Sequence, residues 1–415
     1  MRVPAAGQPV ANELIASCMS PCVNRPVHLI EPGCVFPARR TRYTETTWRT
    51  IGNGRIIFLR TWTDAKTTKT GRPTMSSMPQ ARIHAPDHIE LDQVEMPAVG
   101  ADDVLVQVAR CGICGSDLAY ARIGGIPGAA SPFALGHEFA GTVVETGINV
   151  SNYQAGDRVV VNPDRGDNAI GSGGVQGAFA SHIVYRGATT AAQGLLKLPD
   201  ALDFETGALI EPLAVGMHAA RQGRIRPGDK VAVLGAGPVG LASAIGARHL
   251  GAEQVVLVDL SERRLQVARE LGFTALHAGR DGLAAQLRAT HDVITNNPML
   301  GEQPGTDVYI EATGVGAVLQ DITTTARKGA RIVVVGVHFA PVEFDMTNFL
   351  IRELQITASM AYPDEFPEVI DMLLSGTIDV RPLISHRFPL SRFKEAFAQA
   401  QQADQAVKVM VDCQH

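Results

Sequence analysis

Between residues 81 and 209, the apolar positions fall into short runs separated by Gly, Pro and Asp. Closely spaced runs with turn signals between them are typical of a β-rich, partly closed, barrel-like domain. The predicted strands cover residues 89–94, 104–108, 140–145, 158–161 and 180–184.

From about residue 210 to 357, the pattern changes to strands that alternate with helices, which implies a parallel sheet covered on both faces. The predicted elements are strands 230–234, 255–259, 307–311 and 331–335, with helices 238–250 and 261–271. A helix at 365–375 and an amphipathic segment at 390–402 follow, and we expect them to pack back on the first domain. The prediction is an α/β protein with residues 210–357 inserted between 78–209 and 358–415.

Apolar residues show no sustained helical or strand periodicity in residues 1–77, and prolines stand at 4, 9, 21, 26, 32 and 37. They carry 11 Lys and Arg against 4 Asp and Glu, a balance of +7, so a whole-chain charge of −5 leaves −12 for the rest. This segment faintly resembles an organellar transit peptide. We predict an unstructured or spurious extension, with translation starting at Met75 or Met78, which the intact mass of the native protein would test.

Composition excludes several classes of protein. The chain has 415 residues, 45% hydrophobic and 19% charged, as expected of a globular protein with large cores. No uncharged apolar run reaches about 18 residues, so no membrane span is predicted, and the acidic balance gives no basic face for nucleic acid. Beyond residue 77, Cys111, Cys114 and Cys413 are too few for a disulfide framework, which favours a reducing, cytoplasmic compartment.

A glycine-rich turn follows the predicted strand at 230–234, with the sequence Gly235-Ala236-Gly237-Pro238-Val239-Gly240. Gly235 permits a tight turn, Gly237 lets the backbone approach a pyrophosphate, and Gly240 lets the helix pack on its strand. The amino terminus of the helix attracts the phosphates. This order of strand, turn and helix predicts a dinucleotide site.

Asp259 ends the next strand, 19 residues after Gly240. A carboxylate there is placed to bond both ribose hydroxyls, which favours NAD over NADP. Arg263 and Arg264 leave NADP open, because either side chain could reach a 2′-phosphate. Further expected cofactor contacts are Arg264, Thr313, Val335 and Gly336.

A second group of residues carries metal chemistry. Cys111 and Cys114 form a CxxC motif, which could be a redox pair or half of a zinc ribbon, but no second CxxC exists. His137, Glu138 and Glu211 add an imidazole and two carboxylates. A thiolate, an imidazole and one or two carboxylates are the mixture expected of a catalytic zinc with one open position.

Several motifs together resemble the zinc-dependent medium-chain alcohol dehydrogenases, most closely their sorbitol and butanediol dehydrogenase branch. They are Gly-Ile-Cys-Gly-Ser-Asp (112–117), Gly-His-Glu (136–138), Gly-Asp-Arg-Val (156–159), Glu-Pro-Leu-Ala-Val-Gly (211–216), the turn at 235–240, Ile-Arg-Glu (351–353) and the run at 382–390. The resemblance covers about residues 78–412. It implies a GroES-like catalytic domain and a doubly wound Rossmann cofactor domain.

The resemblance also implies roles for individual residues. Cys114 and His137 would bind the zinc directly, Glu138 would bind it or exchange with water, and Glu211 would bind it directly or through water. Cys111 would not be a ligand. Asp117 would orient the site, and Ser116 would be the first proton acceptor.

The sequence departs from the family pattern in two places. The stretch 162–176 has no cysteine, although many members carry a structural zinc on four cysteines there, so we predict one catalytic zinc per chain and no structural zinc. Ala361 and Ala119 stand where polyol-oxidising relatives have Arg and His, which favours a less hydroxylated substrate. Tyr120 is a candidate for lining the substrate pocket.

The predicted function is hydride transfer between NAD and a secondary alcohol, diol or ketose-type substrate. The alternatives are a zinc-free quinone or enoyl reductase of the same superfamily and a non-enzymatic nucleotide-binding protein on the same scaffold. The expected partner is a small-molecule alcohol or ketone, with neither nucleic acid nor membrane. By similarity, we expect a homodimer or homotetramer joined edge to edge through the cofactor-domain sheets.

Overall fold

The computed structural model describes residues 48–51, 55–58, 77–295, 297–362 and 364–415. The chain divides into two units, residues 1–71 and 72–415. In the first unit, β1 (Trp48–Ile51) pairs antiparallel with β2 (Arg55–Phe58). The rest of the predicted extension at 1–77 lies outside the described residues, except Ser77, which begins β3 (Ser77–Ala85).

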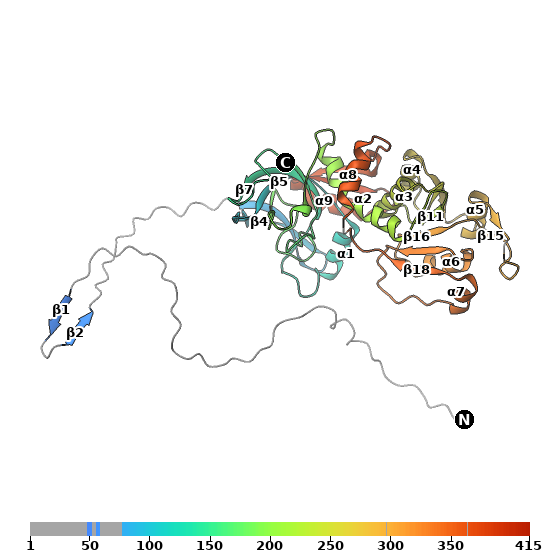
Figure 1. Cartoon of the computed structure of the whole chain (residues 1–415), viewed down its shortest axis with the longest axis horizontal. Coiled ribbons are helices and arrows are strands. Elements are labelled where there is room, and N and C mark those ends of the chain that lie inside the picture. Colours follow the sequence, from blue (N-terminus) through green and yellow to red (C-terminus); the bar gives the residue numbers. More distant parts are fainter. Residues whose placement is uncertain (1–47, 52–54, 59–76, 296, 363) are drawn as a thin grey trace, which may run out of the picture. The chain divides into compact units, whose positions relative to one another are not determined.

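Two sheets form the β-rich part of the second unit, and all their strand pairs are antiparallel except β19 with β20 (Figure 1). β3 pairs with β4 (His88–Glu95) and β6 (Phe133–Ala134). The larger sheet has seven strands, and each strand predicted between 89 and 184 has a counterpart in one of these two sheets. The seven are β5 (Val104–Gly112), β7 (Glu138–Thr146), β8 (Arg158–Val161), β9 (His182–Tyr185), β10 (Leu195–Lys197), β19 (Ile384–Pro389) and β20 (Lys408–Asp412).

A separate six-stranded parallel sheet has the order β13-β12-β11-β16-β17-β18. Its strands are β11 (Lys230–Leu234), β12 (Gln254–Asp259), β13 (Thr274–His277), β16 (Val308–Glu311), β17 (Arg331–Val334) and β18 (Gln355–Ala358). The connecting helices include α3 (Pro238–His249), α4 (Glu262–Glu270), α5 (Leu283–Thr290), α6 (Gly316–Thr325) and α7 (Met346–Arg352). Successive strands are added toward one edge from β11 to β13 and toward the other edge from β16 to β18. A crevice is expected at the carboxyl ends of β11 and β16, where this direction reverses. The predicted α/β architecture is confirmed.

The helix α2 (Phe204–Gln222) joins the two sheets. It begins at Asp203, whose side chain accepts a hydrogen bond from Thr206 N at 2.7 Å. It packs against β7 and β5 on one side and against α3 on the other. A Cβ at Gly216 would lie 2.2 Å from the Ala242 carbonyl carbon, so the two helices touch at their backbones. The domain boundary predicted at 209/210 falls inside this helix, and the exact boundaries stay a prediction.

The segment after the parallel sheet returns to the first sheet. It contains α8 (Phe366–Leu374) and α9 (Phe393–Ala400), and then β20 pairs antiparallel with β5. Residues 408–412 therefore complete a sheet that residues 104–197 begin. Among the described residues, no helix is both long and apolar enough to cross a membrane.

Candidate metal centre and cofactor crevice

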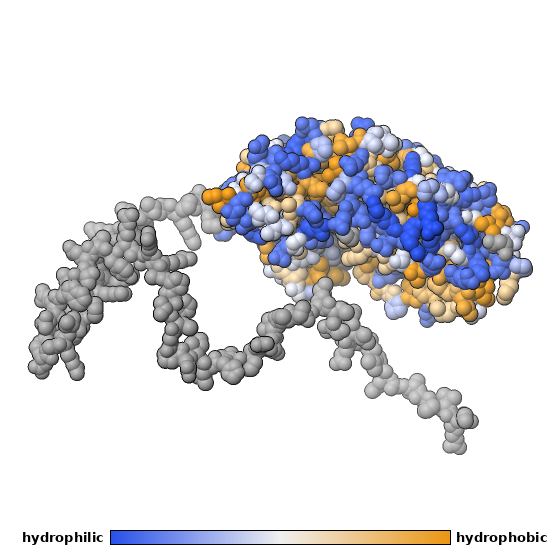
Figure 2. Space-filling model, in the orientation of Figure 1, coloured by the Kyte–Doolittle hydropathy of each residue, from blue (hydrophilic) through white to orange (hydrophobic). Residues whose placement is uncertain are grey.

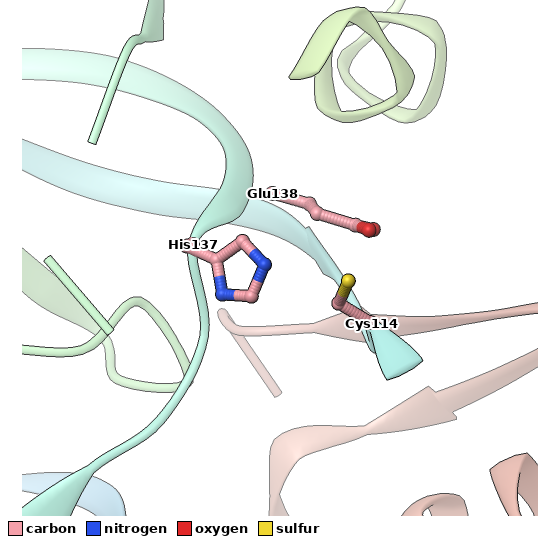
Figure 3. A group of neighbouring side chains, drawn as sticks. All are labelled: Cys114, His137 and Glu138. Atoms are coloured by element: carbon pink, nitrogen blue, oxygen red, sulfur yellow. The ribbon is translucent and has the colours of Figure 1, made fainter. Parts of the chain in front are cut away.

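Three predicted ligands meet where β5 and β7 lie side by side. Cys114 precedes α1 (Gly115–Ile123), and His137 and Glu138 stand at the start of β7, where Glu138 is paired with Gly112 of β5. Their ligand atoms all lie within 4.8 Å of one another. Figure 3 shows the thiol, the carboxylate and one ring nitrogen turned toward a common space. The strand register thus brings together two motifs more than twenty residues apart.

The donor set fits a zinc ion. Thiolate, imidazole and carboxylate are the ligands of catalytic zinc sites, and three of them leave a fourth position for water or substrate. His137 is 8% exposed, and its buried Nδ1 has no hydrogen-bond partner. Burial disfavours the charged ring, but the neighbouring Asp117 and Cys114 outweigh it and raise the pKa of His137 well above its usual range. This surplus of negative charge is what a divalent cation would neutralise.

Asp117 holds the two motifs in register. It is fully buried, and its two oxygens accept hydrogen bonds from Cys114 N at 2.9 Å and Gly136 N at 3.3 Å. Its Oδ1 also lies 3.5 Å from His137 Nδ1. The orienting role expected of Asp117 therefore has a direct geometric basis.

Lys408 is a site residue that the sequence reading missed. Its side chain is 1% exposed, and its Nζ lies 2.6 Å from both carboxylate oxygens of Glu138 and 3.0 Å from the carbonyl oxygen of Ile113. A buried lysine needs such a partner, because an unpaired charge in the interior is costly. The signal in the sequence was a lysine inside the otherwise apolar run 406–411.

Glu211 lies on α2, outside the group of mutually close ligand atoms. Burial raises the pKa of Glu211 to about 7, and the negative charge of Glu138 adds to the shift, while His137, the Tyr362 hydroxyl and Lys408 oppose it. Of the two predicted carboxylates, Glu138 is the one that the geometry groups with Cys114 and His137.

Ser116 and Tyr120 extend along α1 from the metal ligands. Ser116 Oγ lies 3.4 Å from His137 Nε2. The Tyr120 ring packs on Phe133 at 5.3 Å between centroids, and burial raises the pKa of its hydroxyl. Ser116 therefore stands next to the ligand cluster, and Tyr120 lies one turn further along the same helix.

Amides organise the loop at 162–176, where the cysteines of a structural zinc are missing. Asn168 Nδ2 donates to the carbonyl oxygens of Arg165 and Arg186, and its Oδ1 accepts from Arg186 N at 2.8 Å. Gln176 bonds both the N–H and the carbonyl of Val184. Hydrogen bonds from the buried side chains of Asn168 and Gln176 thus tie this loop to residues 184–186.

The glycine-rich turn has the shape that a dinucleotide needs. Gly235 has φ 104°, and a Cβ at Gly240 would lie 1.8 Å from the Gly235 carbonyl oxygen. Pro238 opens α3, with Gly237 as its N-cap. At Gly237, the nearest atom to an added Cβ is Arg264 Nη1 at 3.6 Å. The backbone at Gly237 is therefore open to a ligand, with a guanidinium beside it.

Asp259 and Thr313 flank this turn on opposite sides. Asp259 Oδ2 accepts from Ala236 N at 2.6 Å, and its Oδ1 accepts from Ser261 N at 2.8 Å. The methyl group of Thr313 would lie 3.0 Å from a Cβ at Gly235. The backbone N–H groups of Val335 and Gly336 follow β17 and bond the Glu311 carbonyl oxygen. The predicted cofactor residues thus lie at the carboxyl ends of β11, β12, β16 and β17, where the crevice is expected.

Comparison with known proteins matches two stretches of the chain to family models. Residues 100–200 match the alcohol dehydrogenase GroES-like domain, and residues 238–375 match the zinc-binding dehydrogenase family. The chain is 36% identical to sorbitol dehydrogenase of Mus musculus, over 80% of this chain and 94% of that protein. These matches confirm the predicted GroES-like domain.

Solved structures support the same family assignment. The chain is similar to (2R,3R)-butanediol dehydrogenase from Bacillus subtilis, at 30% identity with a TM-score of 0.71, over 81% of this chain and 99% of that one. It is also similar to a zinc-binding dehydrogenase from Sinorhizobium meliloti solved with NADP, at 30% identity with a TM-score of 0.69, over the same shares of the two chains. The chain therefore belongs to the zinc-dependent medium-chain alcohol and polyol dehydrogenases, in the branch of the sorbitol and butanediol enzymes.

Proposed function

We propose that the protein oxidises a secondary alcohol or vicinal diol to the ketone with NAD, using one zinc ion per chain. The observation that carries this is the complete three-ligand cluster of Cys114, His137 and Glu138. The proposal is also supported by a small cavity that is lined by Lys408, the partner of Glu138, and by Pro238, the first residue of α3. A zinc-free reductase would have no use for such a cluster.

The chain supplies binding and proton transfer for this reaction. Zinc held at the cluster would act as a Lewis acid that lowers the pKa of an alcohol, and NAD would accept the hydride. The substrate carbon loses its hydrogen with both electrons, and its hydroxyl loses a proton. Ser116 Oγ, which lies 3.4 Å from His137 Nε2 at the edge of the cluster, would receive that proton and pass it on toward solvent.

Two alanines support a substrate with few hydroxyl groups. Ala119, on α1, and Ala361 replace residues that in polyol-oxidising relatives would bond additional hydroxyls. A short diol or secondary alcohol has fewer hydroxyl groups that such a pocket would leave without partners.

The test is NADH formation by zinc-loaded protein with 2-butanol, 2,3-butanediol and sorbitol. We expect the diol and the secondary alcohol to exceed sorbitol in kcat/KM, and Cys114→Ala to abolish turnover with all three. Metal analysis should give one zinc per chain. Activity confined to sorbitol would overturn the substrate assignment, and inactivity of the zinc-loaded protein with all alcohols would overturn the function.

NAD rather than NADP is supported by Asp259, whose carboxylate would meet a 2′-phosphate with like charge. The same alcohol assay with NADP in place of NAD tests this. We expect kcat/KM to be at least about tenfold higher with NAD, since charge repulsion of roughly 1.4 kcal/mol accounts for that factor. Equal rates would refute the assignment and point to Arg264 as a phosphate ligand.

We further propose a homodimer or homotetramer that forms through β18, the edge strand of the parallel sheet. Apolar side chains are exposed on and near it: Met346, Leu350, Ile356 and Met360. Figure 2 shows hydrophobic side chains gathered at the edge where Figure 1 places α7 and β18. Sedimentation of the purified protein should give at least twice the chain mass, and Ile356→Lys should reduce it to one chain; a wild-type monomer would refute the proposal.

A cytoplasmic location is the remaining part of the proposal. It is supported by the unpaired thiols Cys111, Cys114 and Cys413 among the described residues, because secreted proteins tend to carry disulfides. Cell fractionation tests it, and recovery with a secreted or organellar fraction would refute it.

A further inference from the structure

Glu311 is a buried carboxylate that no step of the proposed reaction uses. It ends β16, directly beside the point where the strand order reverses, and it is 0% exposed. Its Oε1 accepts hydrogen bonds from Thr313 N at 2.7 Å, from Gly314 N at 2.9 Å and from the Thr313 hydroxyl. One oxygen thus fixes the whole turn that follows β16.

The other oxygen reaches the neighbouring loop. His338 Nε2 lies 2.8 Å from Glu311 Oε2, within hydrogen-bond distance. The Glu311 carbonyl oxygen accepts from Val335 N at 2.9 Å and Gly336 N at 3.0 Å. A single residue therefore ties the loop after β16 to the loop after β17.

The two loops approach each other so closely that no side chain fits between their backbones. A Cβ at Gly336 would lie 2.3 Å from Gly314 N and 2.8 Å from Glu311 Oε2. A Cβ at Gly314, where φ is 70°, would lie 2.4 Å from the Val337 carbonyl oxygen. The backbones are in direct contact, so a shift of one loop must move the other.

The position of this contact relates it to the cofactor crevice. The Thr313 methyl group stands next to Gly235, the first glycine of the phosphate turn. Asp259 and β12 lie on the other side of that turn, and a dinucleotide spans such a crevice from one half of the sheet to the other. If the adenosine half lies at Asp259, the loops after β16 and β17 receive the nicotinamide half.

We propose that Glu311 and His338 are positioning residues that hold these two loops for the nicotinamide half of the cofactor. The inference rests on the proposed function, because it assumes a dinucleotide in the crevice. Glu311 acts through Thr313, Val335 and Gly336, three of the predicted cofactor residues. Its own carboxylate is covered by these partners.

The test compares two ligands that differ in the nicotinamide. NADH carries it and ADP-ribose does not, so binding of both to full-length protein separates the two halves of the crevice. We expect Glu311→Gln and His338→Ala to weaken NADH binding about tenfold, since each removes a hydrogen bond to a charged group. ADP-ribose affinity should stay within about twofold, as no adenosine-side contact changes.

Two further variants sharpen the comparison. His338→Gln keeps a donor and should recover most of the NADH affinity. Glu353→Gln is the matched control, because its carboxylate pairs at 2.9 Å with the partly exposed Lys328, outside the two loops, and it should change neither affinity. In turnover, Glu311→Gln and His338→Ala should raise the KM for NAD and lower kcat.

Every other outcome overturns either this inference alone or the proposed function as well. Equal weakening of NADH and ADP-ribose would show a general structural role, and unchanged NADH affinity would show no role; either result overturns the inference while leaving the proposed function standing. Failure of the wild-type protein to bind either ligand would overturn the proposed dinucleotide function itself and the inference with it. His338→Ala, in a partly exposed loop, serves if Glu311→Gln does not fold.

Discussion

Gly112 leaves space for the buried ion pair between Glu138 and Lys408. A Cβ at this position would lie 2.2 Å from Glu138 Oε2 and 3.2 Å from Lys408 Cδ. The ammonium lies within hydrogen-bond distance of both carboxylate oxygens, so it competes with a metal ion for them. Glu138 thus has a charged partner in the absence of a metal ion, which is compatible with the proposed role as an exchangeable ligand.

Replacing Lys408 with methionine should separate these two roles. Without metal, Lys408→Met leaves Glu138 buried and unpaired, so the free energy of unfolding should fall by about 3–5 kcal/mol. Zinc would then neutralise Glu138 and should restore more stability to the variant than to the wild type. Urea unfolding with and without zinc measures both quantities.

Lys394→Met is the matched control, because this lysine pairs with Glu90 at the surface and its loss should have a far smaller effect. If Lys408→Met and Lys394→Met lower the free energy of unfolding equally, the buried pair of Lys408 and Glu138 does not contribute more to stability than the surface pair, and the prediction is wrong.

Among the structural elements, the segment from α5 to β16 carries a histidine whose charge state affects folding. His291 is fully buried, and its Nδ1 lies 2.8 Å from Thr306 Oγ1. Burial and the nearby Lys230 lower the pKa of His291 to about 4, although Asp307 and Asp292 oppose the shift. The unfolded chain, with an ordinary imidazole pKa of about 6.5, therefore takes up a proton before the folded protein does.

This difference predicts a loss of stability in mild acid. As the pH falls from about 6.5 to 4, the free energy of unfolding should drop by up to roughly 3 kcal/mol on account of His291, with no further loss from it below 4. His291→Asn, which keeps a polar group for Thr306, should flatten this part of the profile. Urea unfolding at a series of pH values measures it, with the exposed His88→Asn as control; identical profiles in wild type and His291→Asn would contradict the prediction.

Strands and helices with a clear periodicity of apolar residues could be predicted from the sequence. Elements that are buried on all sides could not. The strands β8 and β11 were predicted with the bounds that the structure gives, and α3 within one residue. The helix α2 was missed because residues 206–214 are all buried between two layers, which removes the polar face that marks a helix. The ligand cluster followed from its motifs, whereas Lys408 depends on pairing with Glu138 across 270 residues, which local patterns cannot reveal.

At the scale of the whole molecule, the chemistry is divided between two sheets. Cys114, His137 and Glu138 all come from residues that border β5 and β7, whereas the glycine-rich turn and Asp259 belong to the parallel sheet. The shared α2 packs on both and fixes their separation. Metal and dinucleotide should therefore bind independently to a first approximation.

Removal of the metal tests this independence. Treatment with a strong chelator should abolish turnover, because the polarising ion is lost, while NADH affinity measured by fluorescence stays within about twofold. Zinc added back should restore activity. Loss of NADH binding together with the metal would show that the metal centre and the crevice form one cooperative unit.

The return of β20 to β5 has a consequence for the order in which the protein is made. A domain can fold as soon as its residues have been synthesised, and the parallel sheet is complete once residue 358 has emerged. The catalytic sheet must wait, because β20 and Lys408 come some fifty residues later. During synthesis, the nascent chain thus has a finished nucleotide-binding sheet before Glu138 meets its lysine, and the neighbouring edge of β5 stays open for a chaperone or for a wrong strand until then.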